Sequence, residues 1–382
     1  MNFGFGKDWQ ELGKFEKLTD EARSIVFYAE NKASINHFRL LISELTEEKN
    51  LQICYVTSVK NDPMLSSKNK NTFTFYIGDG TARTKFFLTL KAQILIMDMP
   101  DLETFHIKRS KVFPVHYVYI FHSMFSIHSY LRKGAIDNYD TIFCVGEHHK
   151  KEIRETEKVY GLKPKKLITY GFGRLDTLLH EKQKFHQTNP DNDKLVIIAP
   201  SYGKYNLLEV CGLELLEILL KSDFRVLLRP HFRTLRDSKK IIKTVKEKFG
   251  NNPNFILEEG IIPPEKFHNS KCMISDWSGI SFEYAFTFER PVIFIDLPKK
   301  ILNSDSGDIS LEPIEISIRD KIGYVISPKN LEKIPEIIKN TDSNSTTNER
   351  IIKIRSETVY NLGKSAKIGV EAIEKIHMKL NK

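Results

Sequence analysis

Short apolar runs that alternate with helical patterns, twice along the chain, constrain the fold of this sequence more than any other feature. The runs are rich in β-branched and aromatic residues, and amphipathic helical stretches separate them. This alternation is typical of βαβ units, in which helices connect neighbouring strands of a parallel sheet. The first series of strands is expected at Ser24–Ala29, Leu51–Thr57, Thr72–Ile77, Gln93–Met97, Tyr117–Phe121, Thr141–Val145 and Leu167–Tyr170.

A polar stretch, His180–Asp193, is poor in apolar residues and is expected to be a linker. A second alternation follows it, then a polar spacer at Asn340–Asn348 and a helical tail over Glu349–Leu380. The strands of this second series are expected at Lys194–Ala199, Phe224–Leu228, Asn254–Leu257, Cys272–Ile274, Val292–Ile295 and Gly323–Ile326.

With 382 residues, the chain is long enough for two ordinary domains. We therefore expect an α/β fold with two Rossmann-like, doubly wound parallel sheets. The predicted boundaries are 1–180 for an acceptor domain, 194–345 for a nucleotide-donor domain, and 346–382 for C-terminal helices that pack back toward the first domain. This plan resembles the GT-B architecture of glycosyltransferases, in which the two domains face a central cleft. The sequence has no GxGxxG and no Walker A motif, which argues against a dinucleotide dehydrogenase or a P-loop ATPase.

The charge balance favours anionic partners. Lys and Arg number 58 against 49 Asp and Glu, a formal net charge of +9. A generally lysine-rich composition explains this excess equally well. No apolar stretch approaches the roughly 20 residues that span a bilayer, and the N-terminus does not resemble a signal peptide. We expect a cytoplasmic protein whose membrane association, if any, is peripheral. The cysteines form no CxxC pair and are expected to be buried, reduced thiols: Cys54, Cys144, Cys211 and Cys272.

The segment Lys271–Asp296, KCMISDWSGISFEYAFTFERPVIFID, carries the clearest functional signal. An apolar strand ends in small hydroxylated residues and a glycine, and a helix follows at Ile280–Phe288. Such a turn brings backbone N–H groups together with the positive end of a helix, which suits an anion such as a diphosphate. Ser278 or Ser281 could instead simply cap the helix.

This segment resembles the signature of the CDP-glycerol glycerophosphotransferase family, whose members prime and polymerise teichoic acids and related capsule polymers. Trp277, Gly279 and Glu283 stand where the family pattern has Tyr, Ser and Asp. The resemblance covers mainly His122–Asp296. It implies that Ser275, Asp276, Ser278 and Gly279 seat the donor, and that Glu283 holds the ribose hydroxyls.

Further stretches resemble motifs of the same family, among them Gly171–Asp176, where Arg174 and Asp176 are expected to have a structural role. His122 follows the strand Tyr117–Phe121 and matches the family's proposed catalytic base, although a structural role is the alternative and His128 competes for the same assignment. Ser201 ends the first strand of the second domain and could line the diphosphate pocket, or only form a turn. Arg229, His231 and Arg233 follow another strand and suit the recognition of phosphate oxygens, with His231 also able to protonate the leaving group.

The resemblance implies transfer of a phosphopolyol, glycerol phosphate or ribitol phosphate, from a CDP-activated donor to a hydroxyl of a lipid-linked saccharide or cell-surface polymer, with CMP as product. His122 would be the base, and no cofactor is implied. Because no DxD-type pair stands at a convincing strand end, and Asp98–Asp101 is interpreted as a loop, we predict no obligatory metal.

Other functions stay open at this point. A GT-B glycosyltransferase using a nucleotide sugar, a sugar-nucleotide 2-epimerase and an inactive assembly module would all share the architecture. A basic helix beginning at His148 and His149, with Lys150, Lys151, Arg154 and Lys158, could face an anionic membrane or simply solvent. No motif supports nucleic-acid binding.

Overall fold

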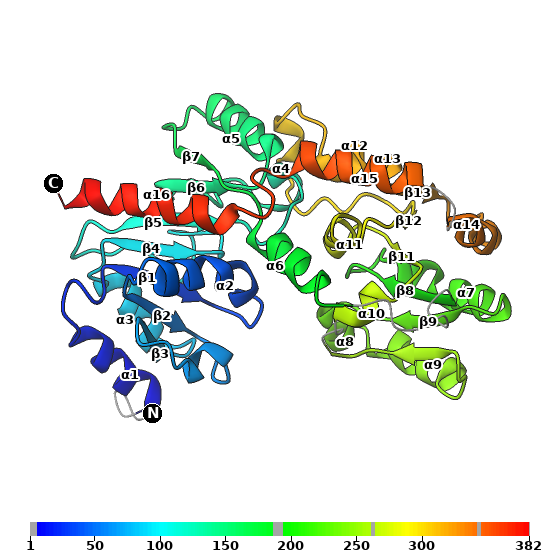
Figure 1. Ribbon diagram of the computed structural model, residues 1–382, viewed down its shortest axis with the longest axis horizontal. Coiled ribbons are helices and arrows are strands. Elements are labelled where there is room, and N and C mark those ends of the chain that lie inside the picture. Colours follow the sequence, from blue (N-terminus) through cyan, green and yellow to red (C-terminus); the bar gives the residue numbers. More distant parts are fainter. Residues whose placement is uncertain (1–5, 186–193, 261–263, 342–344, 382) are drawn as a thin grey trace. The chain divides into compact units, whose positions relative to one another are not determined.

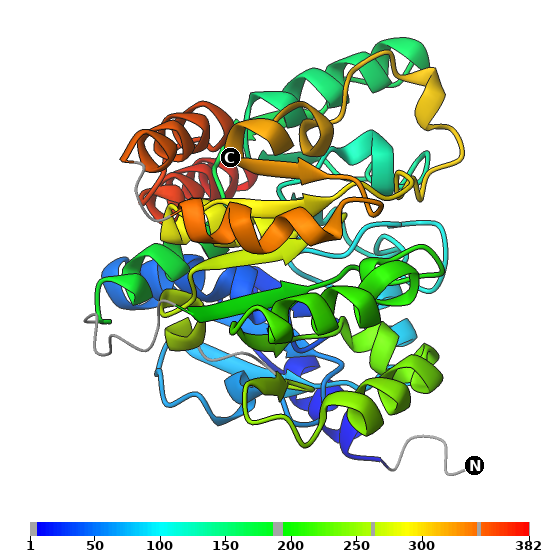
Figure 2. The same ribbon diagram turned by 90° about the vertical axis from the view of Figure 1, so that its right-hand side faces the viewer.

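The structure is a computed structural model that describes residues 6–185, 194–260, 264–341 and 345–381. The chain divides into two compact units. Among the described residues, the first unit contains the chain up to Thr177, Leu302–Leu311 and the part from Thr358 onward. The second unit contains Leu178–Ile301 and Glu312–Glu357. Helices cover both faces of the sheet in each unit (Figures 1 and 2).

The first unit is built on a seven-stranded sheet whose neighbouring strands are all parallel. Its order, β3-β2-β1-β4-β5-β6-β7, reverses between β1 and β4, as in doubly wound nucleotide-binding folds. Every strand expected from the sequence is present, so this part of the fold prediction is confirmed. The strands are β1 Ile25–Ala29, β2 Ile53–Thr57, β3 Thr72–Tyr76, β4 Ile94–Met97, β5 His116–Ile120, β6 Thr141–Cys144 and β7 Lys166–Thr169.

Helices connect most of these strands. α2 (Ile35–Ser43) continues into a π-helical turn at Glu44–Glu48, a short 3₁₀ turn lies at Pro63–Ser66, and another lies at Ser306–Asp308. The connection from β4 to β5 contains no helix. The helices are α1 Lys7–Glu16, α2 Ile35–Ser43, α3 Thr81–Thr89, α4 Ile127–Tyr130, α5 Glu147–Val159, α6 Gly173–Lys182 and α16 Ser365–Leu380. The last residues of α6 belong to the second unit.

The second unit repeats the plan with six parallel strands in the order β10-β9-β8-β11-β12-β13. The order reverses between β8 and β11. The strands are β8 Leu195–Ala199, β9 Arg225–Leu228, β10 Phe255–Leu257, β11 Cys272–Ser275, β12 Val292–Ile295 and β13 Gly323–Ile326. The helices are α7 Leu207–Lys221, α8 Phe232–Asp237, α9 Lys239–Phe249, α10 Pro264–His268, α11 Ile280–Phe288, α12 Ile314–Ser317, α13 Arg319–Ile322, α14 Ile334–Asn340 and α15 Ser345–Thr358, with a 3₁₀ turn at Leu331–Lys333.

Each sheet has its own apolar core. In the second unit, α7 and α9 pack on sheet residues such as Val196 and Ile274. In the first unit, α16 packs against α2 and contributes Val370 and Ile373 to the core. This contact is so close that a Cβ added at Gly369 would lie 2.8 Å from side-chain atoms of Leu41 and Tyr170. The C-terminal helix is therefore an integral part of the first unit.

The four cysteines are all free and buried, as expected. No helix in the described part of the chain combines the length and the apolar character needed to cross a membrane.

Two expectations about chain organisation need correction. The predicted linker starts too early, because His180–Lys182 are the last turn of α6, and residues 186–193 lie outside the described residues. The helical stretch predicted over 349–380 is not continuous, because Asn361 and Gly363 take positive φ angles of 47° and 75° and separate α15 from α16, and α15 already begins at Ser345, inside the predicted spacer.

Candidate active site

In the second unit, the residues predicted to bind the donor lie at the carboxyl ends of β8, β9 and β11. β8 and β11 are neighbours at the point where the strand order reverses. Open α/β sheets bind their ligands at this place, because the loops on either side diverge there and leave room between them. The sheet therefore brings Ser201, Arg229–Arg233 and Ser275–Gly279 to one edge.

Asp276 ties two of these loops together. Its carboxylate accepts hydrogen bonds from the Ser201 N–H at 2.6 Å, the Ser201 hydroxyl at 3.0 Å and the Leu207 N–H at 2.8 Å. Both side chains are almost fully buried. Burial raises the pKa of Asp276, while these hydrogen bonds hold it down. Asp276 and Ser201 thus fix the shape of the site from within, and their direct contact with a donor stays a prediction.

The turn after β11 is held in a similar way. The Ser275 hydroxyl donates to the Ala199 carbonyl at 2.7 Å, and the Ser281 hydroxyl donates to the Ser278 carbonyl at 2.7 Å. Gly279 occupies the N-cap of α11, and no side chain caps this helix, so the capping interpretation of Ser278 and Ser281 is wrong. The Ser278 hydroxyl has no hydrogen-bond partner among the described residues, which leaves it available to a ligand.

Glu283 lies on the first turn of α11 and is half-buried. Trp277, the departure from the family pattern, is braced by donating its indole N–H to the Leu297 carbonyl at 3.0 Å. The guanidinium of Arg319 lies 4.1 Å from the centre of the Trp277 ring, a cation–π contact. Arg319, which also belongs to the second unit, thus packs against the indole ring that replaces the tyrosine of the family pattern.

Cationic groups gather around the ring of Tyr202, which follows β8. The Nζ of Lys300 lies 3.1 Å from the ring centre, and the Arg233 guanidinium carbon lies 4.4 Å from it. The His231 ring centre is 4.6 Å away. Arg229 belongs to the same group, since its charge lowers the pKa of His231. We call Arg229, His231, Arg233 and Lys300 the cationic cluster.

The electrostatics of the cationic cluster keep His231 neutral. Burial lowers the pKa of His231, the charges of Lys300, Arg229 and Arg233 act in the same direction, and together they bring it to about 4. Burial likewise lowers the pKa of Lys300 to about 8, with Asp276 opposing the shift and Arg233 adding to it. The cationic cluster thus brings three cationic side chains together, with Asp237 3.9 Å from Arg233 and Asp276 near Lys300 as neighbouring carboxylates, and this arrangement suits a multivalent anion.

In the first unit, His122 follows β5 at the carboxyl edge of the sheet. Its Nδ1 donates to the backbone carbonyl of Asp98 at 3.1 Å, so the neutral ring carries its proton on Nδ1. Nε2 has no partner among the described residues and keeps a free lone pair. Burial lowers the pKa of His122, and the bond to Asp98 opposes the shift. A neutral imidazole with a free Nε2 is suited to accept a proton.

The other histidines near this loop are structural. His128 lies 3.2 Å from the Glu152 carboxylate through Nδ1, and its Nε2 donates to the Leu311 carbonyl at 3.0 Å. His148 and His149 donate to the carbonyls of Met124 and Phe125, both at 2.9 Å. These contacts pin the loop that carries His122. His128 is therefore engaged on both ring nitrogens, and the imidazoles of the basic helix α5 face inward rather than toward a membrane or solvent.

Sequence reasoning missed Tyr202 and Lys300 as members of the site and treated Asp98 only as loop. Each follows a strand, β8, β12 and β4 respectively, at its carboxyl end. Their position at the carboxyl ends of strands was the signal that could have identified them.

Among the described residues no group of three or more His, Cys, Asp or Glu side chains is arranged to hold a metal ion. His122 and the cationic cluster belong to different units, and their action on one donor stays a prediction.

The model of the CDP-glycerol:poly(glycerophosphate) glycerophosphotransferase family matches residues 14–301. Among solved structures, the wall teichoic acid polymerase TagF soaked with CDPG aligns with a TM-score of 0.60 and 13% identity, covering 98% of this chain and 94% of TagF. The UDP-GlcNAc 2-epimerase of Neisseria meningitidis aligns with a TM-score of 0.60 and 16% identity, covering 92% and 99%. That of Methanocaldococcus jannaschii aligns with a TM-score of 0.57 and 12% identity, covering 92% and 99%.

No curated protein sequence matches the chain closely enough to count as a relative. The structural likenesses establish the GT-B-like fold, since the identities are low. The family match covers most of the chain and includes His122, the cationic cluster and the Ser275–Gly279 turn. The chain therefore belongs to the CDP-glycerol:poly(glycerophosphate) glycerophosphotransferase family and is a transferase of this kind.

Proposed function

We propose that this protein transfers glycerol phosphate or ribitol phosphate from a CDP-activated donor to a hydroxyl of a lipid-linked saccharide or a cell-surface polymer. The cationic cluster at the β8–β11 switch point is the observation that supports the proposal most directly. The chain's family acts on CDP-glycerol, and TagF, with the same fold, is a wall teichoic acid polymerase. We place the reaction in the cytoplasm, with the enzyme peripheral on the inner face of the membrane.

A diphosphate fits the chemistry of the cationic cluster. Arg229 and Arg233 offer guanidinium groups for paired hydrogen bonds to phosphate oxygens, and Lys300 adds a compact charge. The Ser278 hydroxyl and the first turn of α11 follow β11, which lies between β8 and β12 in the sheet. Because these side chains supply the positive charge, we propose that transfer needs no protein-bound metal.

The chemical step is a substitution at phosphorus. The oxygen of the acceptor hydroxyl attacks the phosphorus that carries the polyol and forms a new P–O bond. The P–O bond to the bridging oxygen breaks, and its electron pair leaves with CMP. The hydroxyl proton passes to Nε2 of His122, while the cationic cluster offsets the charge that develops on CMP.

His231 would act at the leaving group. In the free protein its Nδ1 accepts from the Arg233 N–H, so the neutral ring carries its proton on Nε2 as a donor. A bound diphosphate would offset the charges of Lys300, Arg229 and Arg233, and so raise the pKa of His231. His231 could then donate a hydrogen bond, or a proton, to the departing phosphate.

The test measures CMP release from CDP-glycerol and from CDP-ribitol, with and without a polyol-phosphate acceptor, in the presence of EDTA. We expect release that requires the acceptor, and its loss in His122→Ala and His231→Ala. UDP release from UDP-GlcNAc without acceptor would identify an epimerase instead, and sugar transfer would identify a glycosyltransferase. Full biological function in both histidine variants would indicate an inactive assembly module.

A further inference from the structure

The connection between β4 and β5, residues 98–115, forms no helix and leads from the carboxyl edge of the first sheet to its amino edge. Connections of this length without secondary structure are uncommon in compact domains and usually have a function of their own. In the site described above, only its first residue, Asp98, takes part. The role of the other residues follows from how they are held and from what they expose.

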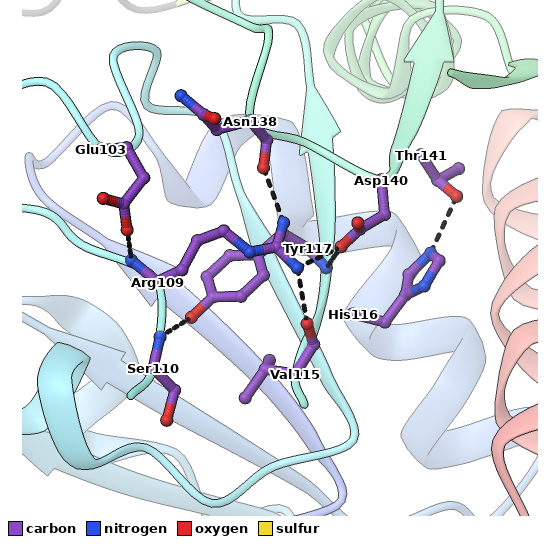
Figure 3. A network of polar contacts seen from close by, with 9 residues as sticks. All are labelled: Glu103, Arg109, Ser110, Val115, His116, Tyr117, Asn138, Asp140 and Thr141. Atoms are coloured by element: carbon purple, nitrogen blue, oxygen red, sulfur yellow. Dashed lines mark hydrogen bonds and ion pairs between the residues drawn. The ribbon is translucent and has the colours of Figure 1, made fainter. Parts of the chain in front are cut away.

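Hydrogen bonds hold this connection in one shape (Figure 3). The Arg109 guanidinium donates to the carbonyl of Asn138 at 2.7 Å and to the Asp140 carboxylate at 3.0 Å. The backbone N–H of Arg109 donates to the Glu103 carboxylate. The segment just before Arg109 is therefore anchored to the start of β6.

That segment, residues 101–107, is a strained turn. Asp101 and Glu103 have φ angles of 73° and 72°, in the left-handed region that residues other than glycine rarely adopt. The Asp101 N–H donates to the Ala135 carbonyl at 2.6 Å, and the Glu103 N–H donates to the Ile107 carbonyl at 2.8 Å. Strain of this kind persists only where the surrounding structure fixes it, and it clusters at active sites and ligand clamps. We call residues 101–107 the strained turn.

The strained turn presents Phe105 to solvent. Phe105 is 60% exposed. The guanidinium carbon of Arg132 lies 4.3 Å from the centre of its ring, and the Nε of Arg132 donates to Asp101 at 2.6 Å. Single exposed apolar side chains are common on protein surfaces, but a strained and braced support beneath one is not. The arrangement therefore holds an aromatic ring ready for contact with a ligand.

The strained turn lies at the carboxyl edge of the first sheet, next to the point where the strand order reverses. Glu30 directly follows β1. Burial raises the pKa of Glu30, and the charges of Arg83 and His106 oppose the shift, so the tip of the turn lies near this carboxylate. Asp98 directly follows β4, the neighbour of β1. Ligands of open α/β sheets bind at such a switch point.

Two carboxylates at this switch point can accept further hydrogen bonds. The Oδ1 atom of Asp98 is buried and has no hydrogen-bond partner among the described residues, which is costly for a buried acceptor. The Glu30 carboxylate accepts a hydrogen bond from Arg83 at 3.3 Å, and a carboxylate has about four acceptor positions. The Asp98 carbonyl also holds the ring of His122, which follows the next strand, β5. A ligand rich in hydroxyl groups fits this combination of acceptors and a base.

We propose that this edge of the first unit binds a saccharide acceptor, with Phe105 stacked on the C–H face of a sugar ring. Glu30 and Asp98 would accept hydrogen bonds from the ring hydroxyls and direct one hydroxyl toward Nε2 of His122. A linear polyol phosphate has no flat apolar face for the aromatic ring, and its negative charges would be repelled by the two carboxylates. The inference rests on the proposed function and narrows its acceptor to a neutral sugar.

The first experiment measures binding to the full chain without any donor. The saccharide probes are the methyl glycosides of glucose, galactose and their N-acetylamino forms, and a glycerol phosphate trimer is the open-chain probe. Saturation-transfer NMR should detect contact with the ring protons of at least one glycoside. Phe105→Ala should weaken this binding about tenfold, as for loss of part of an aromatic contact, and Phe105→Trp should retain it. The matched control, Phe113→Ala, changes another exposed phenylalanine of the same connection and should bind normally.

The second experiment measures CMP release from the CDP-polyol donor with the glycoside that binds best and with the trimer. Phe105→Ala should raise KM for the glycoside about tenfold and leave kcat and the donor KM nearly unchanged. Phe105→Trp should restore the KM of the parent. A merely structural role of Phe105 would change kcat and both KM values together.

The outcomes separate the inference from the proposed function. Glycoside binding that survives in Phe105→Ala, equal weakening in Phe113→Ala, or binding of the trimer but of no glycoside would each overturn the inference. CMP release that is the same in Phe105→Ala and the parent would do so while leaving the proposed function intact. Glycoside binding that depends on Phe105, without CMP release from any donor, would support saccharide recognition and count against the proposed function alone.

Discussion

The Nδ1 atom of His231 accepts a hydrogen bond from the backbone N–H of Arg233 at 3.2 Å, which places the proton of the neutral ring on Nε2. The same imidazole lies at the N-cap of α8 and next to the ring of Tyr202. One contact thus fixes the backbone of the β9–α8 turn and decides which nitrogen can serve a leaving group.

Lys300→Gln is expected to weaken donor binding and to change His231. After burial, the Lys300 charge is the largest cause of the lowered His231 pKa, so its removal should move this pKa upward from about 4. The dissociation constant for CDP-glycerol should rise roughly tenfold or more, as for a lost charge-assisted hydrogen bond. Histidine NMR titration and calorimetry measure the two effects. The neighbouring exposed Lys299→Gln should leave both unchanged.

Asp276→Ala is expected to destabilise the second unit strongly. It leaves the buried N–H groups of Ser201 and Leu207 and the Ser201 hydroxyl without their acceptor. The loss should be about 3 kcal/mol or more, from about 1 to 3 kcal/mol for each buried unsatisfied group. Ser201→Ala removes one of these bonds and should cost about 1 kcal/mol. Denaturant unfolding, followed by tryptophan fluorescence, measures the free energy of unfolding of each variant. If both variants were as stable as the parent, the hydrogen bonds of Asp276 would not stabilise the second unit.

The transfer rate is expected to fall in acid as His122 becomes protonated. Burial lowers the pKa of His122, so the midpoint of the acid limb should lie below the ordinary 6.5. His122→Gln should reduce kcat by about 10² to 10⁴, as for loss of a general base, with little change in the donor dissociation constant. The pH profile of kcat/KM checks this. A limb centred above 6.5, or an unchanged limb in His122→Gln, would exclude His122 as the base.

The first unit is expected to become less stable as the pH is lowered, because His149 is buried in its neutral form. Burial lowers its pKa in the folded protein to about 3, so the unfolded chain, with an ordinary pKa near 6.5, binds more protons below that pH. The stabilisation is therefore complete above about 6.5 and is lost as pH falls toward 3. The expected loss is about 2 kcal/mol at pH 5. Unfolding measured at several pH values should show a flatter dependence in His149→Gln, and an equal slope in both proteins would contradict this origin.

The fold could be predicted from local sequence because its elements are local. Runs such as Val292–Ile295 are apolar throughout, which is typical of strands buried on both faces of a parallel sheet. The alternation of strands and helices then limits the topology to a doubly wound sheet. The break in the C-terminal tail was missed because a positive φ at Asn361 and Gly363 leaves little mark on apolar periodicity.

The sequence by itself determined the two parallel sheets, the family resemblance, and the placement of His122, His231 and the Ser275–Gly279 turn at carboxyl ends of strands. Only the tertiary structure decided which neighbours each side chain has. It joined Lys300 to Tyr202 across 98 positions of sequence, turned Asp276 onto Ser201 and Leu207, and directed His148 and His149 onto the loop of His122. The physical reason is that strand order is set by burial over the whole sheet, and contacts between loops follow from that order rather than from spacing along the chain.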